Sequence, residues 1–185
     1  MDGNFSDSSD QIENMVETTF RRMQNEYQSL LKTAIAHKDA QRYEKAGEVF
    51  AKAAKLLYSH QMDYTKVIKR YNDAAECFLR IKDGRAFNCY LSAIDIDVNK
   101  GVIEKAIENC FISGYKCDLE LGDKYKAEEL YKKGEELRHE HKLSHSCVIT
   151  RFDKSKHGKD LNKALDIYEK VNVNSIQVRG ENTNF

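Results

Sequence analysis

One short pattern recurs along this chain at nearly constant spacing. It is an alanine, an aromatic residue four positions later, and a small or β-branched residue three positions after that. The pattern repeats at intervals of 40, 41 and 37 residues, as Ala46/Phe50/Ala53, Ala86/Tyr90/Ala93, Ala127/Tyr131/Gly134 and Ala164/Tyr168/Val171. On a helix the small residues let a neighbouring helix approach closely, and the aromatic ring fills the groove beside the contact. Repetition on this scale is typical of stacked helix pairs.

The pattern predicts an all-α fold, a tetratricopeptide-like solenoid of antiparallel helix pairs with a period of about 40 residues. A further set, Ala74/Phe78/Ile81, falls between the first two repeats and is assigned to the partner helix of a pair. The chain has no proline in 185 residues and only nine glycines, which also favours helices. Short breaks suited to left-handed helix ends occur at Asp83-Gly84, Lys100-Gly101, Leu121-Gly122-Asp123 and His157-Gly158-Lys159.

The polar ends of the chain set the expected domain bounds. Residues 1–10 and 174–185 are rich in Asn, Ser, Asp, Gly and Thr, so we expect a flexible segment at each end of a helical repeat domain over residues 11–173. The first helix is expected to be capped by Asp10, with Glu13 three residues later. Its apolar residues run from Ile12 to Ala34 at three-to-four spacing, which predicts one apolar face.

Charge and targeting signals narrow the class of protein. Thirty basic and thirty acidic side chains leave a formal charge of zero, which argues against a nucleic-acid partner. No apolar run is long enough for a transmembrane segment, and the acidic, polar start is not a signal peptide. Five cysteines without a C-x-x-C pair read as reduced core thiols, namely Cys77, Cys89, Cys110, Cys117 and Cys147. We therefore expect a cytoplasmic protein whose membrane contact, if any, is peripheral.

No motif in the chain indicates catalysis or a bound cofactor. The glycines are scattered singly, so there is no phosphate-binding loop, and the paired carboxylates suit the wet faces of helices. The segment from His139 to Cys147 gathers histidines and a cysteine, but its irregular spacing fits a solvated helix junction better than a zinc framework. We predict a protein that is not an enzyme and that has no cofactor or metal site, with zinc binding at His139–Cys147 as the open alternative.

Two groups of basic residues are candidates for partner binding, because curved helical stacks commonly bind acidic helices or peptides along one face. The alternative is that both groups only keep the surface soluble. The first group lies near predicted helix ends and comprises Lys38, Arg42, Lys69, Arg70, Arg80, Lys82 and Arg85. The second comprises Arg151, Lys154, Lys156, Lys159 and Lys163.

Three stretches carry a resemblance to a known family. Lys38 to Ala54 holds Ala-Gly-Glu-Val-Phe followed by Ala53-Ala54, and Asp73 to Phe78 leads without a gap into Ala86 to Ile96. Lys163 to Val171 reads Lys-Ala-Leu-Asp-Ile-Tyr-Glu-Lys-Val. Over roughly residues 30 to 175 the chain resembles the soluble NSF attachment proteins (SNAPs), particularly the alpha type.

The resemblance implies a twisted array of paired helices that coats the SNARE four-helix bundle, of which syntaxin-like chains are part. It also implies recruitment of the AAA ATPase N-ethylmaleimide-sensitive factor, which pulls the bundle apart. By position, Lys38 and Arg80 match basic residues of the family's SNARE-facing surface. The family continues for several more helices to the tail that engages the ATPase, so we expect this chain either to support disassembly or to compete with it.

Some positions depart from the family pattern. Val102, Glu108 and Ser146 stand where basic residues are expected, and the segment Ser8 to Glu13 stands where the family has a membrane-attachment loop. Loss of a cation weakens binding to an acidic partner, and a change to glutamate inverts the sign. These departures favour the alternative function, a tetratricopeptide-like protein-protein interaction scaffold without a SNARE role.

Overall fold

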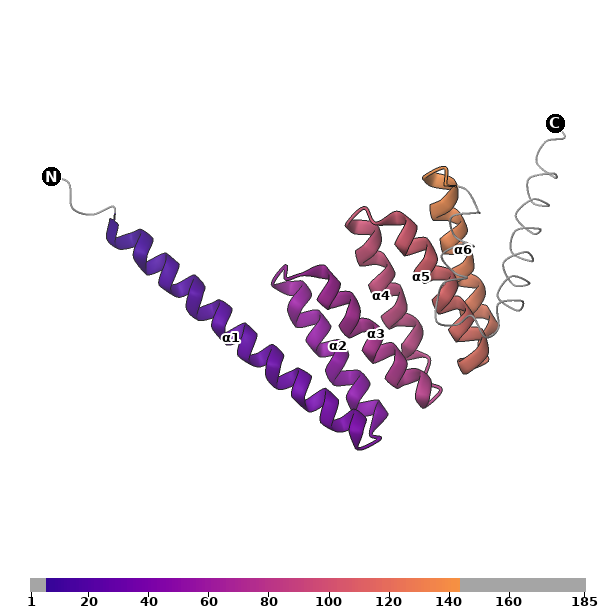
Figure 1. Ribbon diagram of the computed structural model, residues 1–185, viewed down its shortest axis with the longest axis horizontal. Coiled ribbons are helices and arrows are strands. Elements are labelled where there is room, and N and C mark those ends of the chain that lie inside the picture. Colours follow the sequence, from indigo (N-terminus) through magenta and orange to yellow (C-terminus); the bar gives the residue numbers. More distant parts are fainter. Residues whose placement is uncertain (1–5, 144–185) are drawn as a thin grey trace. The chain divides into compact units, whose positions relative to one another are not determined.

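The computed structural model describes residues 6–143, with side chains from Asn14 onward. This part of the chain contains α-helices and one π-helix and has no strand (Figure 1). The elements are α1 (Ser6–Asp39), α2 (Tyr43–Ser59), α3 (Tyr64–Arg80), α4 (Arg85–Asn99), α5 (Ile103–Lys116), the π-helix η1 (Cys117–Leu121) and α6 (Lys124–Glu140). The predicted all-α, helical-repeat fold is confirmed.

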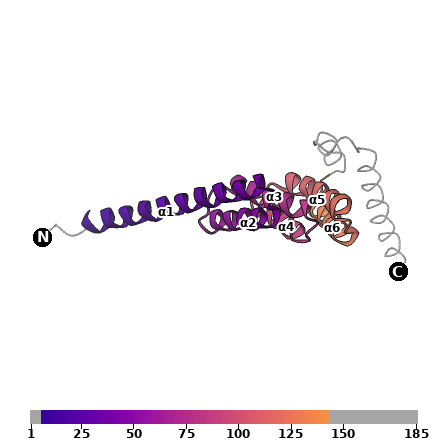
Figure 2. The same cartoon turned by 90° about the horizontal axis from the view of Figure 1, so that it is seen from below.

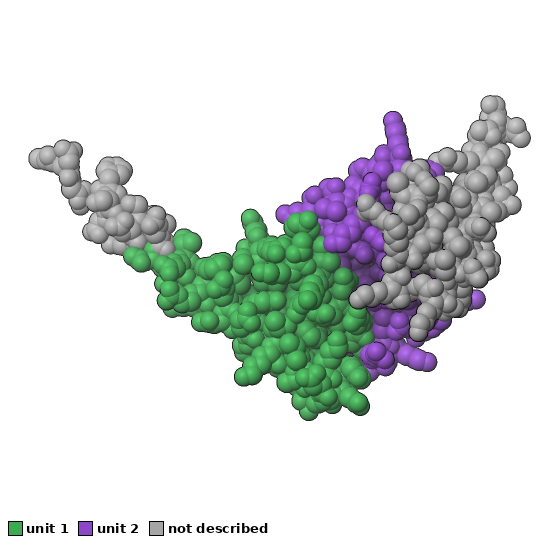
Figure 3. Space-filling model, in the orientation of Figure 1, with its two compact units in different colours: residues 1–77 green, residues 78–185 purple. Residues whose placement is uncertain are grey.

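The chain divides into two compact units, residues 1–77 and 78–185, coloured separately in Figure 3. In the first unit, α1 packs along α2, and α3 follows. In the second unit, α4 packs on α5 and α5 on α6, while η1 contacts both α5 and α6. Each unit therefore builds its core from neighbouring helices joined by short turns.

The recurring Ala-aromatic-small pattern occupies every second helix. Its first three copies lie on α2, α4 and α6, and each of their residues is buried. Ala74 and Phe78 are buried on α3, so the further set does belong to a partner helix, but Ile81 lies beyond the end of α3 and is 40% exposed. The prediction was wrong for Ile81 because the helix ends one residue before it. The copy at Ala164 lies outside the described residues.

The contact between α5 and α6 shows what the small residues do. A Cβ added at Gly114 on α5 would lie 2.4 Å from Cε1 of Tyr131 on α6, and one added at Gly134 on α6 would lie 3.0 Å from Cε2 of Phe111 on α5. The two rings stack with centroids 5.8 Å apart and planes 19° from parallel. Each helix thus supplies the glycine that makes room for the other helix's ring.

The helix ends agree only partly with the predicted breaks. Gly101 and Gly122 have φ of 72° and 70°, so the predicted left-handed helix ends are confirmed there. Gly84 has φ −62° and precedes α4, and it is Lys82 that turns the chain after α3, with φ 53°. Gln41 and Gln61 are also left-handed and end α1 and α2, at breaks that were not predicted because neither contains a glycine.

Three helices begin just after an aspartate that bonds the first turn. Asp63 Oδ1 accepts from the Thr65 amide at 3.0 Å, Asp83 Oδ1 from the Arg85 amide at 2.8 Å, and Asp123 Oδ1 from the Lys126 amide at 3.1 Å. Hydrogen bonds to the ionised carboxylate lower the pKa of all three aspartates. These carboxylates take the place of the missing backbone partners at the starts of α3, α4 and α6.

The first helix is longer than its predicted cap implies. It begins at Ser6, so Asp10 lies inside α1 and does not cap it.

Four of the five cysteines fall within the described residues and are buried, as predicted. Burial raises the pKa of Cys110 and of Cys117 to about 12, which keeps both as thiols at neutral pH. Cys147 and the expected domain end at residue 173 lie outside the described residues.

Because Gly114 leaves room for the Tyr131 ring, substitutions at these two residues should have non-additive effects on stability. Gly114→Ala should lower the free energy of unfolding by about 2 kcal/mol, because the new methyl group overlaps the buried Tyr131 ring. In a Tyr131→Leu background the overlapping ring atoms are absent, so Gly114→Ala should cost less than about 0.5 kcal/mol. Urea unfolding of the four proteins measures this coupling.

Gly101→Ala is the matched control, because apart from the adjoining residues no atom of the described chain lies within 4 Å of a Cβ at Gly101. Its cost of about 1 kcal/mol comes from the left-handed backbone alone and should be the same in both backgrounds. An equal cost for Gly114→Ala with and without the Tyr131 ring would contradict the packing explanation.

Candidate partner-binding residues

Lys38 lies in the last turn of α1 and is exposed. Its backbone carbonyl accepts from the Gln41 amide at 2.9 Å, which closes the helix end beneath the side chain. Burial raises the pKa of Asp73 and of Cys77 on α3. The nearby Lys38 ammonium opposes this rise at both groups, but its effect is smaller. A cation in the last turn also interacts favourably with the helix dipole, so the end of α1 holds positive charge at the surface.

Arg80 is the last residue of α3 and is exposed. Among the described side chains, no carboxylate lies within 4.0 Å of its guanidinium. The turn that follows is fixed by two backbone bonds: the Lys82 amide donates to Leu79 O and the Asp83 amide to Phe78 O, both at 2.9 Å. This turn presents Arg80, the partly exposed Ile81 and the exposed Lys82 in succession.

Lys38 belongs to the first compact unit and Arg80 to the second, so each is placed within its own unit. Both are surface cations at helix ends. Sequence reasoning included Lys82 in its first basic group but missed the apolar Ile81 between the two cations, because it assigned Ile81 to the buried face of α3.

Two members of the first basic group have internal roles, contrary to the prediction. Arg70 lies mid-helix and is buried, with its guanidinium 3.1 Å from Asp73 Oδ2 and 5.8 Å from the centre of the Phe50 ring. Arg85 lies 2.7 Å from Asp83 Oδ2 and 4.5 Å from the centre of the Phe78 ring. Carboxylate pairing and ring contact hold both cations against the protein. Arg70 is the buried one, and a buried charge needs such partners. The remaining members of that group, Lys38, Arg42, Lys69, Arg80 and Lys82, are exposed.

Several predicted residues lie outside the described part of the chain. They are Ser146, Cys147, the second basic group from Arg151 to Lys163, and the motif from Lys163 to Val171. Of the two departures that are described, Val102 precedes α5 and Glu108 lies within it, and both are partly buried.

The described part of the histidine segment makes local contacts on α6. His139 Nε2 lies 3.0 Å from Arg138 Nη2 and 3.7 Å from Glu135 Oε2, while His141 is exposed at the helix end. The buried Arg138 donates to the same Glu135 oxygen at 2.8 Å, which makes this end of α6 an ion-pair cluster. Among residues 14–143, no group of three or more His, Cys, Asp and Glu side chains is arranged to hold a metal ion.

Asp97 is a fully buried carboxylate near the end of α4 that sequence reasoning did not single out. Its Oδ2 accepts from Asn109 Nδ2 of α5 at 2.9 Å, and Lys105 Nζ lies 3.9 Å from Oδ1. No described residue donates a hydrogen bond to Oδ1. Burial raises the pKa of Asp97, against the smaller effects of Lys105 and Asn109. The residue links α4 to α5 and offers no access to a substrate.

The described residues thus define an all-helical repeat protein with exposed cations at several helix ends. Helical-repeat proteins of this class commonly present extended surfaces that bind other proteins. The sequence model of the family described as soluble NSF attachment protein, SNAP, matches residues 5–182, so the chain belongs to the SNAP family. This is a family of non-enzymatic adaptors.

The match confirms the resemblance drawn from the repeat and motif residues. No individual curated protein matches the sequence significantly. None of the helices in the described residues is both long and apolar enough to cross a membrane.

The burial of Asp97 predicts a pH-dependent effect on stability. Its folded pKa is raised, so the folded protein loses stability as pH rises from the ordinary aspartate range, near about 4, through the folded pKa. Asp97→Asn should therefore raise the free energy of unfolding at pH 7 by roughly 1 kcal/mol and have little effect at pH 3. Thermal or urea unfolding across this pH range measures the difference.

Asp95→Asn on the same helix is the matched control. Asp95 is exposed and pairs with Lys133 at 2.9 Å, so its change should cost less than about 1 kcal/mol and give no gain at pH 7. A loss of stability in Asp97→Asn at pH 7 would mean that the bonds to Asn109 and Lys105 outweigh the cost of burial.

Proposed function

We propose that this chain is a SNAP-type adaptor that binds SNARE four-helix bundles in vesicle fusion and intracellular protein transport. The observation that carries the proposal is family membership over residues 5–182. In this role the protein acts in the cytoplasm and lies peripherally on vesicle or target membranes through its partners.

The charge of the described surface supports the proposal. Family membership implies an acidic partner, the SNARE bundle. Exposed cations attract and orient an acidic partner. Lys38 and Arg80 are assigned as SNARE-facing residues, each exposed at the end of a helix. Arg70 and Arg85 are not assigned, because both are held by carboxylates and rings of the protein itself.

The proposed partners are the SNARE bundle, with its syntaxin-like chains, and the ATPase N-ethylmaleimide-sensitive factor. A chain that binds the bundle either supports ATPase-driven disassembly or competes with other SNAPs for the same bundle. A disassembly assay distinguishes these two outcomes, because the first accelerates disassembly by the ATPase when the chain is the sole adaptor and the second slows it when a complete SNAP is present.

A specific observation favours a second candidate, a helical-repeat scaffold for an unrelated peptide or helix. Val102 and Glu108 lie where the family pattern expects cations, and neither side chain supplies positive charge. A partner that binds a surface with fewer cations would be less sensitive to salt concentration than an acidic SNARE bundle held by cations.

Arg80→Glu should weaken binding to an assembled SNARE bundle by about tenfold at low salt, because it replaces one attraction by one repulsion. The loss should shrink at physiological salt, where exposed charges are screened beyond about 8 Å. A pull-down with the assembled bundle at both salt concentrations measures the effect.

Lys100→Glu is the matched control. Lys100 is also exposed and follows the end of a helix, and the substitution makes the same charge change at a position not assigned to the partner. Equal losses for the two variants would reduce the effect to net charge and overturn the assignment of Arg80. Failure of the folded wild-type chain to bind at either salt concentration would overturn the proposed function.

A further inference from the structure

The first helix is twice as long as the helix that packs against it. α1 has 34 residues and α2 has 17, and the two run antiparallel through a turn at Ala40–Arg42. A 17-residue antiparallel partner can lie beside only the last 17 residues of α1, which begin at Met23. Met23 is 4% exposed, whereas every described side chain of α1 before it is exposed. Figures 1 and 2 show the earlier half of α1 extending past α2.

This uncovered half, residues 6–22, is called the α1 extension. At 1.5 Å per residue it is about 25 Å long. Among its described side chains, from Asn14 onward, three large apolar ones are exposed: Met15 at 64%, Val16 at 60% and Phe20 at 44%. Val16 and Phe20 continue, at spacings of four and three residues, the stripe whose next member is the buried Met23. The apolar face of the extension is therefore continuous with the α1–α2 interface.

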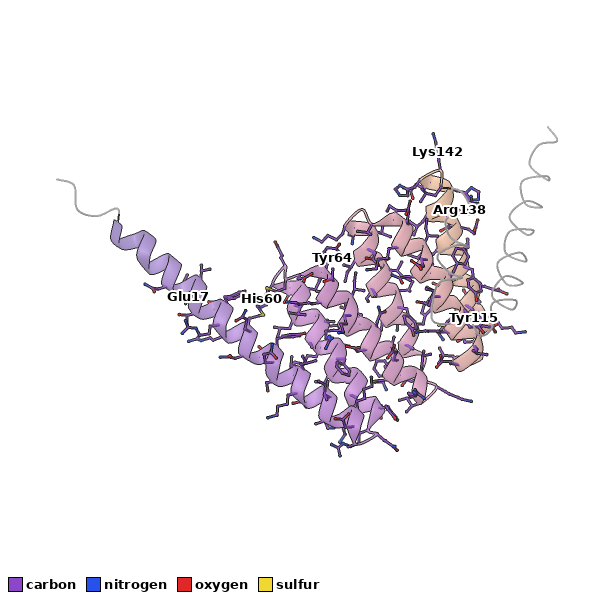
Figure 4. The ribbon with its side chains drawn as sticks, in the orientation of Figure 1. Glu17, His60, Tyr64, Tyr115, Arg138 and Lys142 are labelled. Atoms are coloured by element: carbon purple, nitrogen blue, oxygen red, sulfur yellow. The ribbon has the colours of Figure 1, made fainter. Side chains whose placement is uncertain are left out.

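The charged side chains beside the apolar stripe indicate what kind of partner can pack on this face. Glu17 and Arg21 flank the stripe on the same side, 2.7 Å apart and 66% and 72% exposed. Figure 4 shows Glu17 on the part of α1 beyond α2. When two copies of a helix pack antiparallel about a two-fold axis, the same flank of each helix faces the other copy, and every contact from residue i to residue j is repeated from j to i. Glu17 of each copy can then lie opposite Arg21 of the other copy. Both of these contacts join a negative charge to a positive one.

The charge of the extension disfavours an anionic lipid surface. Residues 6–22 contain Asp7, Asp10, Glu13 and Glu17 against Arg21 and Arg22, a formal charge of −2. Helices that lie in a membrane interface usually carry lysine and arginine along the polar face. A complementary protein helix fits these signs better, and the extension is complementary to itself.

We propose that the α1 extension is a self-association surface, on which the extension of a second copy packs antiparallel through Val16 and Phe20 with Glu17 opposite Arg21. A helix pair of this length buries less than a standard protein interface, so the dimer is weak, with a dissociation constant in roughly the micromolar range. This inference does not rest on SNARE binding.

Sedimentation equilibrium of the full chain in reducing buffer, from about 1 to 200 µM, tests the proposal across the concentrations where such a dimer forms. The wild type should show a monomer–dimer equilibrium, and Phe20→Ser should weaken it at least tenfold. Thr18→Ser is the matched control, because the Thr18 hydroxyl bonds its own helix at Asn14 O, 2.7 Å away on the face opposite the stripe. That variant should dimerise like the wild type.

A charge exchange tests the antiparallel arrangement directly. Glu17→Arg places two arginines on the flank and Arg21→Glu places two glutamates there, so each variant alone should repel its own copy and dimerise at least fivefold more weakly at low salt. An equimolar mixture restores opposite signs and should contain more dimer than either variant alone at the same total concentration, with the mixed dimer as the main species. Circular dichroism checks that both variants keep the helix content of the wild type.

A wild-type chain that stays monomeric at 200 µM would overturn the proposal, as would a dimer that Phe20→Ser leaves unchanged. A mixture no more dimeric than its two components would overturn the antiparallel pairing. Wild-type chain that is monomeric but binds anionic phospholipid vesicles in a Phe20-dependent manner would assign the same face to a lipid surface and reject self-association.

Discussion

The structure depends on the meeting of small residues and aromatic rings between neighbouring helices. Gly114 makes room for Tyr131 and Gly134 makes room for Phe111, so α5 and α6 approach closely enough for the two rings to stack. At the other described repeats the first small residue is an alanine, and Ala46 and Ala86 are fully buried. The residues of the repeated pattern form a buried face on each of α2, α4 and α6. Core packing therefore determines which surface residues are left for a partner.

This packing sorts the basic residues into two kinds. Arg70 and Arg85 pair with aspartates and lie over aromatic rings, and they stabilise the protein itself. Lys38 and Arg80 are at helix ends, where the chain turns away and the side chain is left in solvent. An adaptor needs cations of the second kind, because a guanidinium held by both a carboxylate and an aromatic ring of its own protein has little left for an acidic partner.

Much of the fold could be predicted because it rests on local patterns. The Ala-aromatic-small repeat predicted the helix class and the buried faces, and Gly101 and Gly122 marked two helix ends. The ends at Gln41, Gln61 and Lys82 were missed because these residues adopt the left-handed conformation without being glycine. The internal roles of Arg70 and Arg85 depend on rings and carboxylates that only the folded chain brings together. The exposed half of α1 was missed because its stripe does not reveal where α2 ends.

A SNAP-family helical repeat that binds the SNARE bundle through surface cations must compete with other SNAPs for that bundle. Competition is measured with a labelled complete SNAP bound to the assembled bundle and this chain added at increasing concentration. The chain should displace the labelled protein, and displacement should weaken as salt rises. Full retention of the labelled protein at a saturating excess of folded chain would show that this chain does not bind the SNARE bundle at the surface that SNAPs use.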